Sequence, residues 1–257
     1  MHSFPAPDDP APTTAPREQP EQATPGHDRQ HHNERGRDRP GRDRPIAARP
    51  DQTRAWVRMP SGRRLDLLDP TPFDWDDADL ALGLARTYRW GGHSAWPLPL
   101  SVAQHSISVM LLRRAAAPSI GPLEELRELL HDAEEGLLGF DAISVIKPFL
   151  GEAFSALTRR LEHMVFLRYG LPAWDARAHA AHKRADRLAA ASEAVHVAGW
   201  SHEEVRRTLK IRAAVLATDP LAARYGCRPW EPWPPALACE RFLAELERLT
   251  RAVQDAA

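Results

Sequence analysis

The sequence is poor in cysteine and in uninterrupted apolar stretches. Cys227 and Cys239 are the only cysteines among 257 residues, too few for a disulfide framework or a four-thiolate zinc site. No run approaches the roughly 18 apolar residues of a membrane-spanning helix. The N-terminus also lacks the apolar core of a secretory signal. We therefore expect a soluble, cytoplasmic protein without a membrane partner.

Excess charge of either sign is absent as well. The 34 basic residues oppose 35 acidic ones, which gives a formal net charge of −1. This balance excludes a protein that coats nucleic acid through bulk charge, and no nucleic-acid partner is expected. It leaves open a local basic pocket. Hydrophobic residues make up 43% of the chain, which is enough to fill a core.

Residues 1–50 differ in composition from the rest of the chain. They hold 10 of the 24 prolines, and eight arginines oppose eight acidic residues. Such a segment cannot bury enough apolar surface to offset the entropy lost on ordering, so we predict a disordered tail. An arm that binds nucleic acid or a partner is the alternative. The folded domain is expected at residues 51–257, which contain all eight tryptophans.

Beyond residue 70 the pattern is helical almost everywhere. Residues 56–67, with Pro60-Ser61-Gly62 at their centre, are typical of a small hairpin. Apolar periodicity and capping residues predict helices at 78–88, 101–115, 123–137, 151–169, 174–197, 202–209 and 236–254. The expected fold class is therefore all-α, a helical bundle with a small N-terminal β-hairpin.

Ionisable residues occur inside three of these predicted helices. His131-Asp132 stands in the middle of one, His105 on the preceding helix and Asp186 on a later one, each with apolar neighbours. A helix interior offers a buried ionisable pair no backbone partner, so its burial needs another reason. Imidazole and carboxylate together suit Mn²⁺, Fe²⁺, Co²⁺ or Zn²⁺. A single helical histidine is more often a surface or core residue, and it is the combination that favours a metal site.

The order of these residues resembles the H…HD…D signature of the HD-domain metal-dependent phosphohydrolases. Flanking segments are similar to the branch of bacterial 5′-deoxynucleotidases, and the resemblance runs from about residue 54 to 250. The matching segments are residues 88–93, 101–106, 130–135 and 183–193. The resemblance implies an HD-domain helical bundle and the hydrolysis of deoxyribonucleoside 5′-monophosphates to nucleoside and phosphate.

The same resemblance implies one divalent transition metal as cofactor. Its four protein ligands would be His105, His131, Asp132 and Asp186. They leave positions open for water and a phosphate oxygen, so that the ion acidifies the water and polarises the phosphoryl group. Glu193 is expected to hydrogen-bond within the site or to pack structurally.

Two acidic residues match the catalytic positions of the family. Glu135 follows Asp132 by three residues and His131 by four, and it is the acid/base candidate on the same helix face. Glu134 would point about 100° away and is expected to be solvated or salt-bridged. Asp141 matches the second carboxylate. It stands one position late relative to Glu135 but keeps the usual step of six residues to Lys147.

Four residues are expected to bind the nucleotide substrate. The fork of Arg89 suits phosphate, and Trp90 offers a flat face for the sugar or base. His93 follows two glycines, and Lys147 is one of only three lysines in the chain. A packing or surface role is the alternative for each of them.

Other functions remain open at this point. A nucleoside triphosphate triphosphohydrolase would use the same ligands but needs several cations, and Arg89, His93 and Lys147 are few for that task. A non-catalytic HD-domain binding module is a further alternative, against which the intact ligand set argues. His179 and His182 would permit a second metal on the helix of Asp186. The base, the metal and the oligomeric state, including a homodimer, are undecided.

Overall fold

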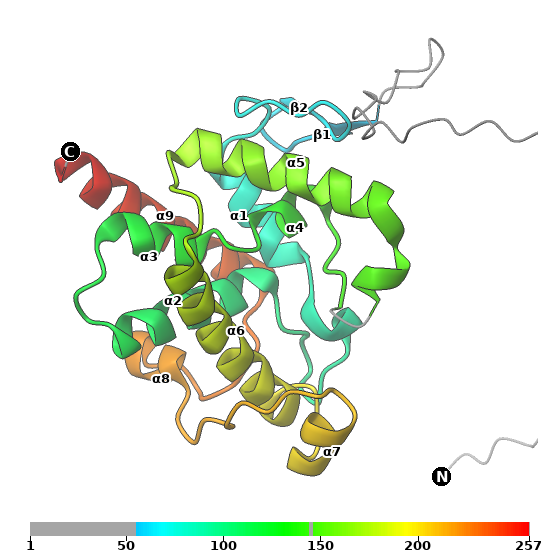
Figure 1. The fold of residues 1–257 in the computed structure, drawn as a ribbon, viewed down its shortest axis with the longest axis vertical. Coiled ribbons are helices and arrows are strands. Elements are labelled where there is room, and N and C mark those ends of the chain that lie inside the picture. Colours follow the sequence, from blue (N-terminus) through cyan, green and yellow to red (C-terminus); the bar gives the residue numbers. More distant parts are fainter. Residues whose placement is uncertain (1–54, 144–145, 257) are drawn as a thin grey trace, which may run out of the picture. The chain divides into compact units, whose positions relative to one another are not determined.

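A computed structural model describes residues 55–143 and 146–256 of the chain (Figure 1). All of these residues belong to one compact unit, and the tail predicted at residues 1–50 lies outside the described residues. Helices dominate this unit, which confirms the all-α prediction. They are α1 (Asp77–Arg86), α2 (Val102–Ala116), α3 (Pro122–Leu129), α4 (Ala133–Leu138), α5 (Gly151–Tyr169), α6 (Ala176–His196), α7 (His202–Arg207), α8 (Pro220–Tyr225) and α9 (Pro235–Asp255).

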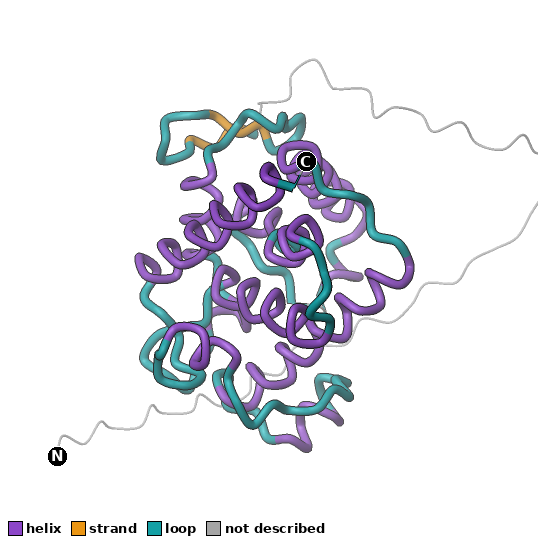
Figure 2. The backbone as a smooth tube through the Cα atoms, turned by 90° about the vertical axis from the view of Figure 1, so that its left-hand side faces the viewer, coloured by secondary structure: helices purple, strands orange, loops and turns teal. Residues whose placement is uncertain are grey.

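The predicted hairpin is present at the start of the described chain. Strands β1 (Trp56–Arg58) and β2 (Arg64–Asp66) pair antiparallel, and Gly62 in their turn has a φ of +92°, which glycine adopts without strain. Ser61 ties the turn to α1, because its amide and its hydroxyl donate to the Asp79 carboxylate at 2.9 and 2.5 Å. Figure 2 shows the two strands together at one edge of the helical body.

Side-chain caps set the first residues of several helices. The Ser101 hydroxyl accepts from the Gln104 amide at 3.2 Å at the start of α2. The Ser201 hydroxyl accepts from the Glu204 amide at 3.2 Å at the start of α7, and the Glu204 carboxylate accepts in return from the Ser201 amide at 2.9 Å. These reciprocal bonds satisfy amides that have no partner within a helix. Both predicted helix starts are therefore confirmed.

The single helix predicted at residues 123–137 is wrong, because the chain forms two helices there, α3 and α4. Leu130 (φ −99°, ψ 13°) and Asp132 (φ −117°, ψ 25°) leave the helical conformation between them. His131-Asp132 consequently lies in a turn and not in mid-helix. The break lets His131 Nδ1 bond the backbone carbonyl of Glu128 at 2.8 Å. In an unbroken helix the amide four residues later would use that carbonyl.

Helices α1 and α4 meet through two glycines. A Cβ atom on Gly83 would lie 2.3 Å from the carbonyl oxygen of Gly136, and one on Gly136 would lie 2.8 Å from the backbone nitrogen of Leu84. Only glycine allows the two backbones to approach this closely. The contact fixes α4 against the buried face of α1. Within the described chain, no helix combines the length and apolar character needed to cross a membrane.

We expect Gly83→Ala to lower the free energy of unfolding by about 1–3 kcal/mol, because the new methyl group overpacks against the α4 backbone. Without this contact, alanine inside a helix would instead stabilise by about 0.5–1 kcal/mol. Urea denaturation measures the difference. Gly121→Ala is the control, since nothing lies within 4 Å of a Cβ at that position. Stabilisation by Gly83→Ala would contradict the close contact.

Candidate metal centre

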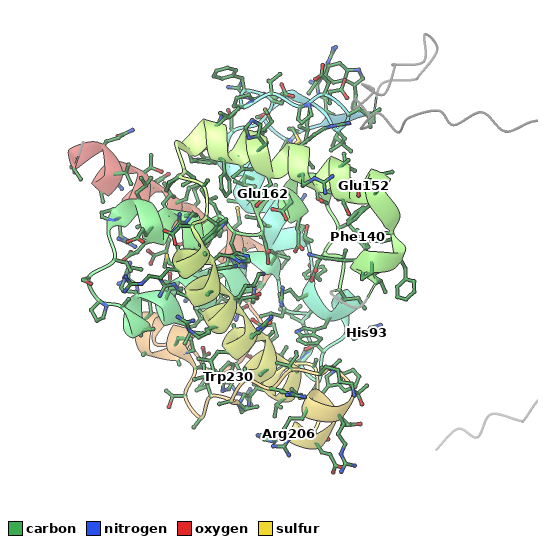
Figure 3. All side chains as sticks on the ribbon, in the orientation of Figure 1. His93, Phe140, Glu152, Glu162, Arg206 and Trp230 are labelled. Atoms are coloured by element: carbon green, nitrogen blue, oxygen red, sulfur yellow. The ribbon has the colours of Figure 1, made fainter. Side chains whose placement is uncertain are left out.

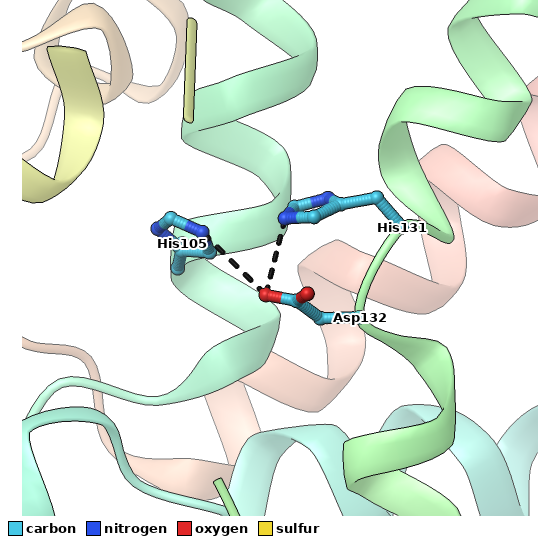
Figure 4. Close-up of side chains that lie close together, drawn as sticks. All are labelled: His105, His131 and Asp132. Atoms are coloured by element: carbon cyan, nitrogen blue, oxygen red, sulfur yellow. Dashed lines mark ion pairs between the residues drawn. The ribbon is translucent and has the colours of Figure 1, made fainter. Parts of the chain in front are cut away.

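Three of the four predicted metal ligands meet at one point. His105 comes from α2, whereas His131 and Asp132 come from the turn between α3 and α4 (Figure 4). One potential ligand atom of each lies within 4.8 Å of the other two. Asp132 Oδ2 is 3.1 Å from His131 Nε2 and 3.7 Å from His105 Nε2. His105, which precedes His131 by 26 positions, thus meets His131 and Asp132 at one carboxylate oxygen.

The fourth predicted ligand approaches from α6. Asp186 Oδ1 lies 3.5 Å from His105 Nε2. Its other oxygen, Oδ2, accepts a hydrogen bond from Lys183 Nζ at 3.1 Å. Asp186 therefore contacts the cluster through His105, and all four predicted residues occupy one site built from three separate parts of the fold.

The imidazole nitrogens give a direct test of whether a metal ion fits here. The Nε2 atoms of His105 and His131 are both buried without a hydrogen-bond partner. Leaving one buried polar atom unsatisfied costs about 1–3 kcal/mol, so two beside one carboxylate need an explanation. The opposite nitrogens are held: His105 Nδ1 bonds Glu193 Oε1 at 2.6 Å, and His131 Nδ1 donates to the Glu128 carbonyl. Anchoring Nδ1 in this way turns Nε2 toward a metal ion.

The charges around the cluster also favour a cation at this point. Burial and the Arg89 guanidinium lower the pKa of His105, but the Glu193 and Asp186 carboxylates outweigh them and raise it to about 9. For Asp132 burial acts in the other direction and raises the pKa, yet His131 and the neighbouring cations hold that pKa well below its usual range. The site therefore stabilises positive charge at His105 Nε2. A metal ion can take the place of that proton, as is usual when imidazole becomes a ligand.

Arg89 lies among the carboxylates of the site. Its Nε donates to Glu193 Oε2 at 3.0 Å, while its Nη1 lies 3.7 Å from Asp132 Oδ2 and 4.0 Å from Asp141 Oδ2. Burial lowers the pKa of Arg89, but the carboxylates of Glu193, Asp141 and Asp132 outweigh it and keep the guanidinium charged. Glu193 consequently joins Arg89 to His105. The predicted hydrogen bond of Glu193 within the site is confirmed.

Behind the histidines, one buried carboxylate joins three parts of the chain. Glu128 is 1% exposed, and its Oε1 accepts from Arg113 Nε of α2 at 2.8 Å. Its Oε2 bonds His182 Nδ1 of α6 at 2.7 Å. Its backbone carbonyl holds His131, as described above. The elements that Glu128 joins are those that carry the predicted metal ligands.

His182 therefore belongs to this network through its Nδ1. Among the described residues, no group of three possible ligands includes His179 or His182. The second metal that their spacing permitted finds no support in the structure. The ring of His182 lies between those of His131 and Trp174, with centroids 4.8 and 4.7 Å away.

Two glutamates adjoin Asp132 at the start of α4. Glu134 and Glu135 each place a carboxylate oxygen within 4.8 Å of the Asp132 carboxylate and of each other. Burial, reinforced by the charge of Asp132, raises the pKa of Glu135 to about 10 and that of Glu134 to about 8. Glu134 is half-buried, its Oε2 is buried without a partner, and no ion pair of Glu134 is found among the described residues, so the structure does not support the expected salt bridge. The helix that carries both glutamates begins only at Ala133. The predicted directions of Glu134 and Glu135 assumed a helix that includes Asp132, so they do not apply.

A cavity of about 1160 Å³ opens onto this cluster. The substrate and acidic residues predicted from the sequence line it: Arg89, Trp90, His93, Asp132, Glu135, Asp141, Lys147 and Asp186. Lys147 Nζ lies 3.4 Å from Glu135 Oε1. Asp141 lines the cavity despite its one-residue offset from the family pattern. Burial raises the pKa of its carboxyl group, against the opposing charge of Arg89. His93 is exposed at the cavity wall.

Arg89 and Trp90 lie in a tight turn that gives their side chains different neighbours. Residues Arg89–Gly92 form a short 3₁₀ segment in which Trp90 (φ +58°) adopts the left-handed conformation. This conformation is unfavourable for a residue with a Cβ atom, and it occurs mainly where a functional site requires it. The turn places the guanidinium of Arg89 among the buried carboxylates and leaves the indole at the cavity wall.

Sequence reasoning missed part of the cavity lining. Helix α6 contributes Lys183, Arg184 and Arg187, and the segment that follows α7 contributes residues 209–213. Trp200 also lines the cavity. The charges of Lys210 and Arg212 were the only sequence signal in that segment, and no motif connects them to the metal ligands.

We expect Glu128→Gln to lower the free energy of unfolding by about 3–5 kcal/mol, since it leaves the buried charge of Arg113 without its carboxylate partner. Urea denaturation followed by circular dichroism gives the value. Glu152→Gln is the matched control. It removes a pair with Arg159 in which both side chains are more than 60% exposed, and it should cost less than about 1 kcal/mol. Equal losses in the two variants would contradict the role of Glu128.

The sequence of this chain was compared with protein-family models and with known proteins. No family model matches the chain. The chain is similar to an uncharacterized protein of Rhodobacter capsulatus, with 47% identity over 155 residues. The matched region covers 60% of this chain and 79% of the relative. The chain therefore belongs to the same protein family as this uncharacterized Rhodobacter capsulatus protein.

Proposed function

We propose that this protein is a metal-dependent phosphohydrolase of the HD-domain type. Its proposed reaction is the hydrolysis of deoxyribonucleoside 5′-monophosphates to nucleoside and phosphate. The observation that carries the proposal is the pair of buried, unpartnered imidazole nitrogens, His105 Nε2 and His131 Nε2, beside Asp132. The H…HD…D resemblance supports the same conclusion, because it selected these residues by their sequence pattern alone.

The chemistry of the donor atoms narrows the cofactor. His105, His131, Asp132 and Asp186 would together hold one divalent transition metal, and this mixture of nitrogen and oxygen donors suits Mn²⁺, Fe²⁺, Co²⁺ or Zn²⁺. Such an ion supplies Lewis acidity, which polarises a phosphoryl oxygen and acidifies a water molecule. Glu193 fixes the ring of His105 through Nδ1.

Glu135 is the proposed proton-transfer residue. Its side chain is 5% exposed, lines the cavity and lies beside Asp132. Its Oε1 faces Lys147, whereas Oε2 has no hydrogen-bond partner and is available to a reacting group. A carboxyl group at this place can pass a proton to the departing 5′ oxygen. Lys147 holds the carboxyl group in position.

Arg89 and Trp90 are the proposed contacts to phosphate and sugar. The Nη1 atom of Arg89 lies near Asp132 and Asp141, so a phosphate that enters beside Asp132 would meet a charged guanidinium. The indole of Trp90 lies at the wall of the same cavity. Stacking on an indole favours deoxyribose, because a 2′-hydroxyl there would lose hydration without gaining a partner.

A triphosphohydrolase is the second candidate, and one observation favours it. Scarcity of cations was the sequence argument against this activity, and that argument is wrong. Besides Arg89, His93 and Lys147, five basic residues line the cavity: Lys183, Arg184, Arg187, Lys210 and Arg212. The number of phosphates on the substrate is therefore a question for kinetics.

A phosphate-release screen over nucleoside mono-, di- and triphosphates, each with Mn²⁺, Co²⁺, Mg²⁺ and Zn²⁺, tests the proposal. We expect the highest kcat/KM for a deoxynucleoside monophosphate. A preference for the triphosphate of tenfold or more, about 1.4 kcal/mol in transition-state binding, would select the second candidate. Release from no substrate would overturn the enzymatic proposal and leave a binding module.

We expect Asp132→Asn to bind metal at least tenfold more weakly than the wild type, because it removes the oxygen that both imidazoles face. Metal content after dialysis and the metal-dependent rise in Tm report this loss. Glu152→Gln serves again as the control with unchanged metal content. Full occupancy in Asp132→Asn would refute the assignment of this cluster as the metal site.

We expect Glu135→Gln to keep its metal and its affinity for substrate but to lose about 10²–10⁴-fold in kcat, the usual scale for proton-transfer catalysis. Glu134→Gln is the neighbouring control, with an expected loss of less than about tenfold. Steady-state kinetics on the metal-loaded proteins gives both values. If Glu134→Gln shows the larger loss, proton transfer belongs to that residue instead.

A further inference from the structure

The cavity carries charged residues of two kinds. Close to the metal ligands each cation has a carboxylate partner: Arg89 pairs with Glu193, Lys147 with Glu135, and Lys183 with Asp186. Positive charge in this part of the cavity is neutralised. It can hold one phosphate in place but offers little excess attraction for a second.

The remaining cations of the cavity lack such partners. Arg184 and Arg187 lie on α6, and Lys210 and Arg212 lie in the segment after α7. All four are exposed, and none forms an ion pair with a carboxylate in the described part of the chain. Four uncompensated charges of one sign in a concave surface repel one another and attract an anion. We call these four residues the outer cations.

The backbone at Lys210 supports a functional reading of this group. Lys210 has a φ of +58°, one of three left-handed conformations among the described residues other than glycine. Two of these three, Lys210 and Trp90, line the same cavity. Such strain tends to persist where a ligand contact requires it, as argued above for Trp90.

The size of the cavity leaves space beyond that needed by one nucleoside monophosphate. Its volume of about 1160 Å³ exceeds the range of about 300–1,000 Å³ that is common for small-molecule sites. Along α6 the lining residues run from Lys183 to Ala190, a stretch of about 10 Å at the rise of an α-helix. There is room for a second charged group beyond the one at the metal centre.

We propose that the outer cations Arg184, Arg187, Lys210 and Arg212 form a subsite for a second phosphate group of the substrate. This inference rests on the proposed function, because it takes the metal centre as the place where the first phosphate reacts. Arginine forks and a lysine ammonium are the side chains that bind phosphate most strongly. The second phosphate can stand on the far side of the sugar, as in a 3′,5′-bisphosphate, or farther along a 5′-triphosphate chain.

The test compares kcat/KM for a deoxynucleoside 5′-monophosphate, its 3′,5′-bisphosphate and its 5′-triphosphate. The double variant Lys210→Gln/Arg212→Gln removes two outer cations at exposed positions. Arg206→Gln is the matched control, because Arg206 is an exposed arginine of α7 that does not line the cavity (Figure 3). We expect the double variant to lower the kcat/KM of either the 3′,5′-bisphosphate or the 5′-triphosphate, relative to that of the monophosphate, by tenfold or more. The substrate whose kcat/KM falls in this variant identifies the position of the second phosphate.

Calorimetric binding of the 3′,5′-bisphosphate and of the 5′-triphosphate to metal-loaded protein separates this inference from the proposed function. If the wild type hydrolyses no substrate but binds one of these ligands at least tenfold more tightly than the double variant does, the function fails and the subsite stands. If the monophosphate is hydrolysed but neither longer substrate gains from the outer cations, the subsite is overturned and the function stands. An equal loss in Arg206→Gln would also overturn it, since the effect would then be general charge.

Discussion

One buried carboxylate fixes the relative positions of the helices that build the candidate site. Glu128 binds Arg113 of α2 and His182 of α6, and its carbonyl binds His131. Buried charges are tolerated only with full sets of hydrogen bonds, so this arrangement has little freedom to shift. Arg113 lies two turns beyond His105 on α2, and His182 lies one turn before Asp186 on α6. The spacing of the ligands is therefore set by groups that do not themselves face the proposed ion.

The parts that sequence could predict were those determined by short-range chemistry. Alternating and helical apolar patterns located the hairpin and most helices, and Ser101 and Ser201 marked two helix starts. The break after Leu129 could not be predicted in this way. Residues 123–135 contain neither glycine nor proline, and every local preference there favours a continuous helix. The side chain of His131 takes the Glu128 carbonyl that the backbone would use in a continuous helix, and a local sequence pattern does not reveal this contact.

The candidate site likewise has a part that the sequence predicts and a part that it does not. The order His, His-Asp, Asp was sufficient to select four residues that converge, because ligand chemistry restricts the residue types so strongly. The cation wall formed by Arg184, Arg187 and the segment 209–213 carries no motif. Its members become neighbours only because α6 and the chain after α7 border one cavity. Surface arginines are common in this sequence, with 34 basic residues in all, and their number alone does not distinguish those that line a cavity.

The contact between Gly83 and Gly136 has a consequence for how this protein family can change. It holds α4, which carries Glu134 and Glu135, close to α1 through two backbones. A substitution of either glycine would therefore shift the position of Glu135. The wall formed by Arg184, Arg187 and residues 209–213 presents four exposed cations, while its apolar residues Leu209, Ile211 and Ala213 pack against a hydrophobic cluster. Substitution of these exposed cations would change the charge of the cavity without disturbing the contact between α1 and α4. The charge of this wall is therefore less constrained by packing than the position of Glu135 is.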